Sequence, residues 1–356
     1  MGKTIVLTGG GTAGHVTPNL ALLPGLRERG FDIHYIGSFN GIEKELMTKA
    51  GVPYSGISTG KLRRYLSKEN LKDVGNVLRG IREAKKLMKE IRPDIVFSKG
   101  GYVAVPVVRA AAKYHIPVII HESDMTPGLA NKLCYSAASK ICCNFPETVE
   151  LLPKEKAVLS GSPIREELLS GSREAGLRFT GLSGEKPVLL MIGGSSGARI
   201  LNERLRSSLD TLLETFDIVH LCGKGNLDES LKKPGYLQYE YISEELKDLF
   251  ALADVIFSRA GANALCEFLA LKKPALLVPL SKAASRGDQI LNAKSFAAQG
   301  FSEMIEEEEL TDEKLISGLL ALYKNRERYI AKMAESSQSN GVGVILGLID
   351  ELTEGK

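Results

Sequence analysis

The chain opens with a short apolar strand, a glycine-rich loop and a helix, and it repeats that opening in its second half. A strand at Thr4–Thr8 leads into the loop 9–15, and a strand at 187–192 leads into the loop 193–198. Between and after these openings, β-branched runs alternate with helical patterns. Such alternation requires parallel sheets covered by helices on both faces. The sequence therefore predicts an α/β fold with two Rossmann-like domains, whose parallel sheets face each other across a cleft.

The expected elements fall into two series. Strands are expected at 4–8, 32–36, 94–98, 117–121 and 140–144, then at 187–192, 217–221, 237–241, 255–258 and 275–279, and clear helical patterns cover 18–29, 71–91, 198–214 and 290–298. The length of 356 residues fits two domains of the usual ~100–200 residues. We place an N-terminal domain at 1–162, a C-terminal domain at 163–338, and a final helix at 339–356 that packs back on the N-terminal domain.

Composition excludes several classes of protein. Hydrophobic residues make up 44% and charged residues 25% of the chain, and no apolar run reaches the ~18–20 residues of a membrane span. The first residues run directly into a strand, without the apolar stretch of a signal peptide. Five cysteines without a Cys-x-x-Cys pair predict reduced thiols in the cytoplasm and no zinc site. The net charge of +3 is too small to indicate a nucleic-acid partner.

The first glycine loop is formally a dinucleotide-binding fingerprint, Gly9-x-Gly11-x-x-Gly14. An NAD site also needs a carboxylate at the end of the second strand, and that strand ends in Tyr-Ile-Gly-Ser at 35–38. We therefore interpret the loop as a phosphate site at a helix N-terminus. His15 ends the loop, and it either caps its own helix or acts as a general base, because helix amides disfavour the imidazolium form.

Four further segments carry residues suited to phosphates and sugars. They are Gly100-Gly101-Tyr102 after the third strand, the loop 193–198 with Ser195, the run 258–267 with Glu267, and the helix start 287–292 with Gln289 and Asn292. Each has a purely structural alternative, namely a tight turn, a solvated helix charge or a helix cap. Their number favours two phosphate-bearing ligands, with ribose on the carboxylate of Glu267 and sugar hydroxyls on the two amide side chains.

A metal cofactor is not expected. The sequence contains no Asp-x-Asp, the carboxylate pair that holds a metal ion against a nucleotide diphosphate. The charge of a leaving diphosphate would then be stabilised by helix N-termini and by Arg165. The chain also lacks a Gly-x-Ser-x-Gly elbow and a His-Glu-x-x-His motif.

Taken together and in order, these motifs resemble those of the peptidoglycan N-acetylglucosaminyltransferases that convert lipid I to lipid II. The resemblance spans nearly the whole chain, and its motifs are Gly-Gly-Thr-x-Gly-His at 10–15, Gly-Gly-Tyr-Val at 100–103, His121-Glu122, 128–132, Gly161-x-Pro163-x-Arg165, 193–202 and 288–292. It implies a GT-B glycosyltransferase with no cofactor, with UDP-N-acetylglucosamine on the C-terminal domain and lipid I on the N-terminal one.

The resemblance also implies roles for individual residues. His15 is the favoured catalytic base. The acceptor side comprises Gly10, Gly11, Gly100, Gly101 and Tyr102. The donor side comprises Thr12, Ala13, Gly14, Asp124, Arg165, Ser195, Ile242, Ala262, Asn263, Ala264, Leu265, Cys266, Glu267, Gln289 and Asn292, with Ser195 on the diphosphate, Ile242 presenting its backbone to uracil and Glu267 on ribose.

The chain departs from the family pattern at three positions. Ala13 stands where many members carry glycine, which slightly narrows the approach to the backbone. Asp124 stands where asparagine is common, so a carboxylate replaces an amide donor near a diphosphate sugar. Ser196 replaces a frequent glutamine.

A basic segment lies between Lys61 and Arg92. It carries eleven basic and four acidic side chains, with apolar residues at near-helical spacing among them. The segment is either an ordinary surface helix or an amphipathic helix that rests on anionic lipid. The resemblance favours the second interpretation, and it implies a peripheral protein on the cytoplasmic side of the cell membrane.

The expected reaction is a direct, inverting transfer. The 4-hydroxyl of N-acetylmuramic acid gives its proton to a base and attacks the anomeric carbon of N-acetylglucosamine, which displaces UDP and forms a β-1,4 bond. Three alternatives remain at this point. They are a sister GT-B enzyme with another acceptor, a UDP-N-acetylglucosamine epimerase, and a noncatalytic module that binds a UDP-sugar.

Overall fold

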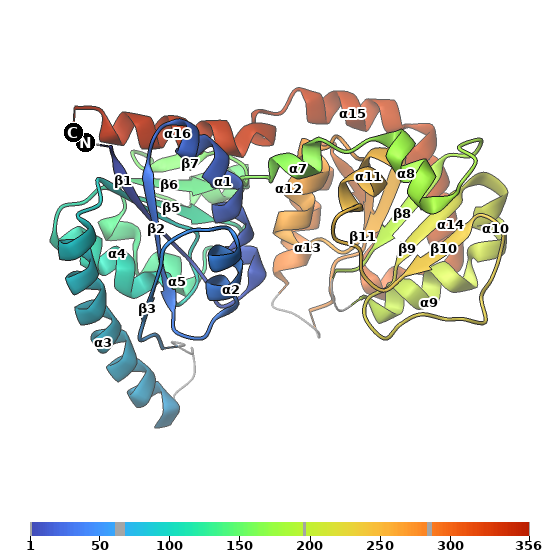
Figure 1. The fold of residues 1–356 in the computed structure, drawn as a ribbon. Helices are drawn as coiled ribbons and strands as arrows, with labels where there is room; N and C mark the ends of the chain where they lie inside the picture. The colour runs from blue at the N-terminus through green and yellow to red at the C-terminus, as the bar shows by residue number, and fades with distance from the viewer. Residues whose placement is uncertain (1, 61–67, 195–196, 283–286, 356) are drawn as a thin grey trace. The chain divides into compact units, whose positions relative to one another are not determined.

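The computed structural model describes residues 2–60, 68–194, 197–282 and 287–355 of the chain (Figure 1). The chain divides into two compact units, and we describe each by itself. Unit 1 comprises Met1–Arg165 together with Asn340–Lys356, and unit 2 comprises Glu166–Ser339. Every strand pairing within the described residues is parallel. The predicted fold class, two Rossmann-like domains with parallel sheets, is confirmed.

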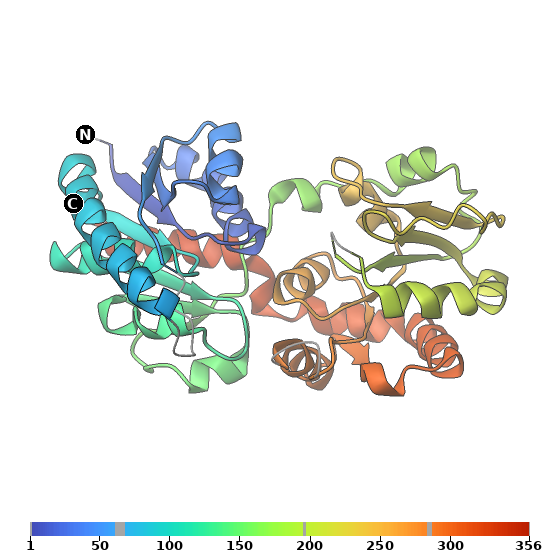
Figure 2. The same cartoon turned by 90° about the horizontal axis from the view of Figure 1, so that it is seen from below.

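Unit 1 is built on a seven-stranded sheet of order β3-β2-β1-β4-β5-β6-β7. Its strands are β1 (Thr4–Thr8), β2 (Asp32–Ser38), β3 (Tyr54–Ile57), β4 (Ile95–Ser98), β5 (Val118–Glu122), β6 (Lys140–Cys143) and β7 (Ala157–Leu159). Its helices are η1 (Ala13–His15), α1 (Thr17–Glu28), α2 (Ile42–Lys49), α3 (Lys68–Ile91), α4 (Ala104–Lys113), α5 (Leu129–Lys132), η2 (Tyr135–Ala137), α6 (Pro146–Glu150) and α16 (Gly341–Thr353). The long helix α3 packs along α4 on one side of the unit (Figure 1 and Figure 2).

Unit 2 is built on a six-stranded sheet of order β10-β9-β8-β11-β12-β13. Its strands are β8 (Val188–Ile192), β9 (Asp217–Leu221), β10 (Tyr236–Tyr239), β11 (Val255–Ser258), β12 (Ala275–Leu277) and β13 (Ser302–Met304). Its helices are α7 (Glu166–Leu169), α8 (Arg173–Thr180), α9 (Arg199–Ser207), α10 (Leu209–Thr215), α11 (Leu246–Leu252), α12 (Ala262–Ala270), α13 (Asp288–Ala298), η3 (Glu307–Glu309), α14 (Asp312–Lys324) and α15 (Arg326–Ala334), and η4 (Ser337–Asn340) ends at the first residue of the returning segment.

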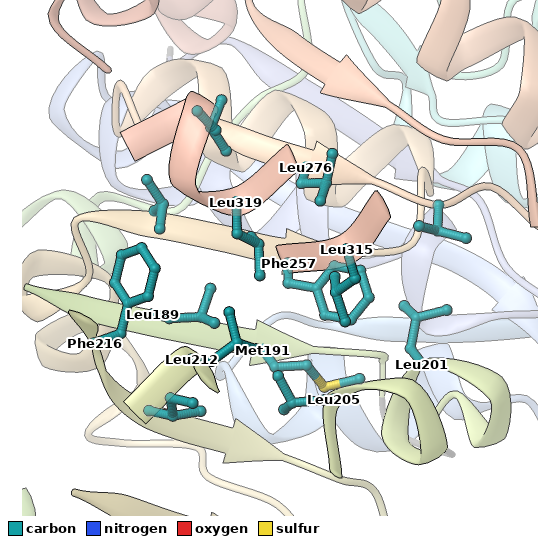
Figure 3. Close-up of a cluster of buried hydrophobic side chains, with 14 of the residues drawn as sticks. Leu189, Met191, Leu201, Leu205, Leu212, Phe216, Phe257, Leu276, Leu315 and Leu319 are labelled. Atoms are coloured by element: carbon teal, nitrogen blue, oxygen red, sulfur yellow. The ribbon is translucent and has the colours of Figure 1, made fainter. Parts of the chain in front are cut away.

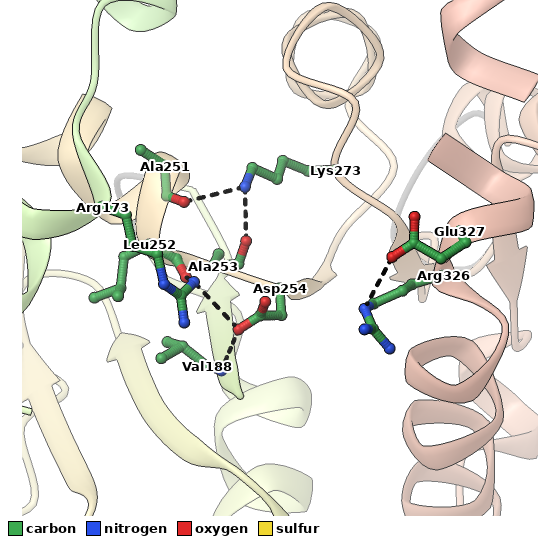
Figure 4. A network of polar contacts seen from close by, with 9 residues as sticks. All are labelled: Arg173, Val188, Ala251, Leu252, Ala253, Asp254, Lys273, Arg326 and Glu327. Atoms are coloured by element: carbon green, nitrogen blue, oxygen red, sulfur yellow. Dashed lines mark hydrogen bonds and ion pairs between the residues drawn. The ribbon is translucent and has the colours of Figure 1, made fainter. Parts of the chain in front are cut away.

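In both units an aspartate side chain accepts a hydrogen bond from the backbone at the start of the first strand. In unit 1 the backbone N–H of Thr4 donates to the carboxylate of Asp94 at 2.7 Å. In unit 2 the backbone N–H of Val188 donates to the carboxylate of Asp254 at 2.8 Å, and Arg173 lies beside that carboxylate (Figure 4). Each aspartate directly precedes the strand that pairs with the first one. The two units therefore share this hydrogen bond as well as their strand topology.

Apolar side chains from the sheet and its covering helices form the core of each unit. In unit 2, Leu189 and Phe257 of the sheet pack between Leu205 of α9 and Leu319 of α14, all with no exposed surface (Figure 3). Burying a leucine of this kind contributes roughly 1.5–3 kcal/mol. The same exclusion of water makes the sheet a rigid base for the loops at its carboxyl edge.

The C-terminal helix α16 is part of the core of unit 1. Its buried residues Ile345, Leu346 and Ile349 belong to the cluster formed by β1, β2 and α1. Arg29 of α1 and Asp350 of α16 form an ion pair at 2.9 Å. The segment after 339 thus covers one face of the first sheet.

The structure differs from the predicted elements in a few places. Three short strands, β3, β7 and β13, were not expected, because they have only three or four residues and weak β-branched patterns. The helix predicted at 198–214 is two helices, since the backbone turns at Ser208 between α9 and α10. The described part of the chain contains no helix that is long and apolar enough to span a membrane.

Candidate active site

The first and fourth strands of unit 1 are neighbours, although the chain runs from β1 outward to β3 before it returns to β4. Loops that follow such neighbours diverge at the carboxyl edge, which is where parallel α/β sheets bind ligands. The loop 9–15 follows β1, and the loop 99–103 follows β4. Gly101 has φ +80, and a Cβ there would lie 2.4 Å from the carbonyl oxygen of Gly10, so the two loops are in direct contact.

The predicted acceptor residues come together at this contact. The ring of Tyr102 packs on Gly11, where a Cβ would lie 2.7 Å from the ring atom Cε1. Gly100 packs on the side chain of Asn131, which a Cβ would approach to 2.8 Å. The glycines allow these close contacts between the loops because they have no side chains. They also leave the backbone amides accessible, as a phosphate site requires.

His15 ends the short helix η1 and lies at the edge of the first loop. Its Nδ1 is 2.9 Å from the hydroxyl of Thr12, and its backbone N–H donates to the carbonyl of Thr12 at 3.1 Å. Asn19, buried in α1, donates to the carbonyl of His15 at 3.1 Å. These three hydrogen bonds fix the backbone of His15 and the orientation of its ring.

The surroundings of His15 keep its imidazole neutral. Burial and, to a smaller extent, the positive charge of Lys99 lower the pKa of His15 from 6.5 to about 4, although the carboxylate of Glu43 opposes these effects. Near neutral pH the ring is therefore an acceptor of protons.

Glu43 is a residue that sequence reasoning missed. Its side chain in α2 has no exposed surface, and it accepts hydrogen bonds from the backbone N–H of Ser38 at 3.1 Å and from that of Gly11 at 3.4 Å. It thereby ties the end of β2 to the first glycine loop. A glutamate in the first turn of an amphipathic helix normally faces solvent, so the sequence carries no signal for this role.

Lys99 is a second residue for which the sequence offered no role. It directly follows β4, its side chain is 1% exposed, and its ammonium group donates to the hydroxyl of Ser123. Its backbone N–H donates to the carbonyl of Thr8 at 2.9 Å, which joins the loop after β4 to the end of β1. A buried cation at this edge favours anionic ligands.

The loop after β5 holds Asp124. Its backbone N–H donates to Glu122 at 3.3 Å, and Glu122 also accepts from Gly128 and from Asn131 at 2.9 Å. Burial raises the pKa of Glu122, and these hydrogen bonds partly offset that shift. Arg165, the last residue of the first segment of unit 1, is half-buried, and its Nε has no hydrogen-bond partner among the described residues.

Unit 2 repeats the arrangement at the carboxyl edge of its own neighbours, β8 and β11. Of the loop after β8, Ser195 and Ser196 lie outside the described residues. Gly197 has φ +75, and a Cβ there would lie 2.1 Å from the carbonyl oxygen of Cys222. The loop therefore leads tightly into α9, whose first turn has no side-chain cap and directs its backbone N–H groups out of the helix end.

The segment predicted to bind ribose begins the helix α12, directly after β11. Ala262, Leu265 and Cys266 face the interior, whereas Asn263, Ala264 and Glu267 are half-exposed. Asn263 and Glu267 are four residues apart and share one face of the helix. The N-terminus of α12 at Gly261 also has no side-chain cap.

Gln289 and Asn292 meet at the loop between β11 and α12. Gln289 accepts hydrogen bonds from the backbone N–H groups of Ala260 at 3.4 Å and of Leu280 at 3.1 Å, and Asn292 donates to the carbonyl of Ala260 at 3.3 Å. Asn292 is 1% exposed. Both amides therefore hold the loop in place.

Arg259 lies in the same loop, and its side chain is 11% exposed. Its guanidinium forms an ion pair with Glu307 at 2.5 Å and donates to the carbonyl of Val278 at 3.1 Å. Arg259 directly follows β11 as Lys99 directly follows β4, so each unit has a cation directly after the strand that neighbours its first one. Ile242, which precedes α11, is 7% exposed, beside the exposed Tyr241.

The predicted residues are thus divided between the units. Those before residue 166 gather at the carboxyl edge of the first sheet, and those from 262 onward gather around the loop after β11 in the second. Within the described residues, no group of three or more histidine, cysteine, aspartate or glutamate side chains is placed to hold a metal ion.

Comparison with known proteins agrees with this division. The glycosyltransferase family 28 N-terminal domain matches residues 5–143, and the family 28 C-terminal domain matches residues 188–345. A protein of Lachnoclostridium phytofermentans named UDP-N-acetylglucosamine--N-acetylmuramyl-(pentapeptide) pyrophosphoryl-undecaprenol N-acetylglucosamine transferase is 60% identical, over 98% of this chain and 99% of its own length. The chain belongs to this transferase family.

Other members of the transferase family match at the same length. A protein of Lachnospira eligens with the same name is 59% identical over 98% of this chain and 99% of its own. The crystal structure of MurG from Acinetobacter baumannii superposes with a TM-score of 0.76 at 26% identity, covering 98% of this chain and 99% of that one. These matches confirm the family that the sequence motifs predicted.

Proposed function

We propose that this chain transfers N-acetylglucosamine from UDP-N-acetylglucosamine to the 4-hydroxyl of N-acetylmuramic acid in undecaprenyl-pyrophosphoryl-muramyl-pentapeptide, and so converts lipid I to lipid II. The observation that carries the proposal is the neutral His15 at the edge of a glycine loop, in a chain of this transferase family. A neutral imidazole can accept the proton of a sugar hydroxyl.

The donor is assigned to unit 2. Its diphosphate would be bound by the amide groups of the loop 193–198 and of the uncapped N-terminus of α12, where the helix dipole favours negative charge. Glu267 would accept hydrogen bonds from the ribose hydroxyls, and the backbone of Ile242 would bind uracil. Gln289 and Asn292 fix the loop that presents these groups, and Gln289 would also bind the sugar.

The acceptor is assigned to unit 1. Its diphosphate would lie on the contacting loops at Gly10 and Gly101, above the buried charge of Lys99. Thr12, Ala13 and Gly14 would line the approach to the donor sugar. No cofactor is proposed, and the charge of the leaving diphosphate falls on helix amides and Arg165.

The proposed chemistry is a single displacement. Nε2 of His15 takes the proton of the acceptor hydroxyl while its oxygen forms a bond to the anomeric carbon. The bond from that carbon to the UDP oxygen breaks, and the configuration inverts to give a β-1,4 linkage. UDP leaves with the bonding electron pair.

We further propose that the protein works at the cytoplasmic surface of the cell membrane. On α3, Val74 is 45% and Leu78 is 55% exposed, with Arg82, Lys86 and Lys89 on the same helix. Apolar side chains that protrude among cations suit an interface of anionic lipid. This exposure argues against a helix that merely packs its apolar residues inward.

Mass analysis of the products from UDP-N-acetylglucosamine, with and without a lipid I analogue, tests the reaction. We expect UDP and the β-linked disaccharide lipid only when the acceptor is present. A free sugar or an epimer formed without acceptor would favour an epimerase, and no turnover would favour a binding module. A panel of other lipid and small acceptors tests for a sister transferase, which would transfer the sugar to one of them in preference to the lipid I analogue.

A further inference from the structure

A pocket of about 360 Å³ opens in unit 1 beside the first glycine loop, and no site residue considered so far except Tyr102 lies in it. It is formed where β2 and β3 end and is closed by α3 and by the loop after β4. Its lining residues are Ser38, Phe39, Asn40, Gly41, Ile57, Ser58, Thr59, Asn76 and Tyr102. The volume is at the small end of the ~300–1,000 Å³ of ligand pockets.

The pocket is continuous with the candidate acceptor site. Its wall Tyr102 packs on Gly11, and its floor Ser38 is held by Glu43, the same buried carboxylate that accepts a hydrogen bond from Gly11. Ser38 donates to Glu43 through both its backbone N–H and its hydroxyl, the latter at 2.5 Å. The pocket and the loop that carries His15 therefore keep a fixed relation to each other.

A second, partly buried contact joins the pocket to α3. The backbone N–H and the hydroxyl of Ser58 donate to Glu83 of α3 at 2.6 and 3.1 Å, which joins the end of β3 to that helix. Asn76, two turns before Glu83 on α3, is half-exposed and lines the pocket from this side. The pocket is thus a built feature of the fold rather than a gap between loops.

The described residues that line the pocket are mostly polar and are uncharged. Among the described lining residues there is no acidic or basic side chain, whereas hydroxyls and the amides of Asn40 and Asn76 are frequent. Phe39 is 52% exposed, and its ring lies across Gly56, where a Cβ would be 2.5 Å from it. These residues offer donors and acceptors to amides and ring faces to methyl groups.

We propose that this pocket binds the amide-bearing side of the acceptor sugar, namely its N-acetyl group and the first amide of its lactyl peptide. The inference rests on the proposed function for the identity of the acceptor. It divides the acceptor between two adjoining surfaces, with the diphosphate on the glycine loops and the amides in the pocket. The pocket then orients the muramic ring so that its 4-hydroxyl meets His15.

A binding experiment tests the pocket without turnover. Muramyl dipeptide, which carries both amides and no phosphate, is titrated into the full chain and into Asn76→Ala and Phe39→Ala by calorimetry. We expect binding to the wild type and a roughly tenfold weaker dissociation constant in each variant, because each change removes one hydrogen bond or one ring contact. Glu90→Ala on α3 and Phe179→Ala in unit 2 are matched controls with exposed side chains outside the pocket.

Kinetics with two acceptors complete the test. One lipid I analogue carries the peptide, and the other ends at the lactyl carboxylate. We expect Asn76→Ala and Phe39→Ala to lower kcat/KM roughly tenfold for the peptide-bearing acceptor, with less effect on the shorter one and none on the donor KM. Unchanged binding of muramyl dipeptide in both variants would overturn the pocket assignment, whereas a wild type that binds it but transfers no sugar would overturn the proposed function alone.

Discussion

The hydroxyl of Thr12 lies 2.9 Å from Nδ1 of His15. When Nδ1 carries the proton and donates a hydrogen bond to the hydroxyl of Thr12, the free lone pair of the imidazole is on Nε2. In this tautomer Nε2 can accept the proton of the acceptor hydroxyl. We expect His15→Ala to lower kcat by ~10²–10⁴. The KM for UDP-N-acetylglucosamine should change little, because the donor is assigned to unit 2. Steady-state kinetics check this, and full turnover in the variant would remove His15 from the mechanism.

Substitutions of Thr12 test whether its hydroxyl selects the working tautomer of His15. Thr12→Ser keeps the hydroxyl and should retain most of the turnover. Thr12→Val keeps the shape and removes the hydroxyl, and we expect kcat to fall roughly tenfold. Equal rates for the two variants would show that the hydrogen bond does not select the working tautomer.

The charge of Lys99 adds to burial in lowering the pH at which His15 becomes protonated. Burial and the charge of Lys99 lower the pKa of His15 to about 4, and Glu43 opposes them. A base works only when unprotonated, so activity is lost as the pH falls through this pKa. Lys99→Met removes the charge at nearly constant volume, and the pKa of His15 should rise. We expect the acid limb of the profile of kcat/KM to move to higher pH in Lys99→Met, whereas the exposed Lys89→Met should leave it in place. An unmoved limb in Lys99→Met would contradict the electrostatic role.

Glu267 distinguishes binding of the donor from catalysis. A carboxylate that accepts hydrogen bonds from two ribose hydroxyls acts equally in the ground and transition states. We expect Glu267→Ala to raise the KM for UDP-N-acetylglucosamine by about 10–100-fold, as for the loss of a hydrogen bond to a charged group, with little change in kcat. Glu203→Ala, on the exposed face of α9, is the matched control. A normal donor KM in Glu267→Ala would remove this residue from the ribose site.

The exposed apolar residues of α3 should govern membrane binding. The double substitution Val74→Asn and Leu78→Asn removes two protruding apolar side chains and leaves the cations in place. In sedimentation with phosphatidylglycerol vesicles, we expect the variant to bind several-fold more weakly than the wild type, and both to release at high salt because the charges are then screened. Leu227→Asn, an exposed leucine of unit 2, serves as control. Equal binding of wild type and the α3 variant would exclude α3 as the contact.

His220 links stability to pH. It lies buried in unit 2 with its Nε2 3.0 Å from the amide oxygen of Asn202, and burial lowers its pKa from 6.5 to about 3. Between these values the unfolded chain binds a proton that the folded chain does not. The stabilisation is therefore complete above pH 6.5 and is lost as the pH falls towards 3. Urea denaturation from pH 7 to pH 4 should show a smaller loss of stability in His220→Gln than in the wild type, by a few kcal/mol at pH 4. The exposed His115→Gln should keep the wild-type slope.

Much of the fold could be predicted from sequence because its signals are local. The strand–loop–helix openings at 4–28 and 188–207 depend on β-branched runs and on glycines with positive φ such as Gly197, and the chain shows both directly. The strands β3, β7 and β13 were missed because such short segments become strands only when a neighbouring strand pairs with them. The helix predicted at 198–214 is divided at Ser208, whose backbone (φ −97, ψ 1) leaves the helical conformation between α9 and α10.

The sequence by itself determined which loops share the carboxyl edge of each sheet, because loops that follow parallel strands all lie at that edge, and it predicted phosphate and sugar sites there. Tertiary structure alone decided the roles of Glu43 and Lys99. Both residues are charged and ordinarily exposed, and the packing of the fold removes them from water, with Glu43 hydrogen-bonded to the first glycine loop and the charge of Lys99 close enough to lower the pKa of His15. A charge acts strongly only where water is excluded, and that exclusion is a property of the folded core rather than of any local pattern.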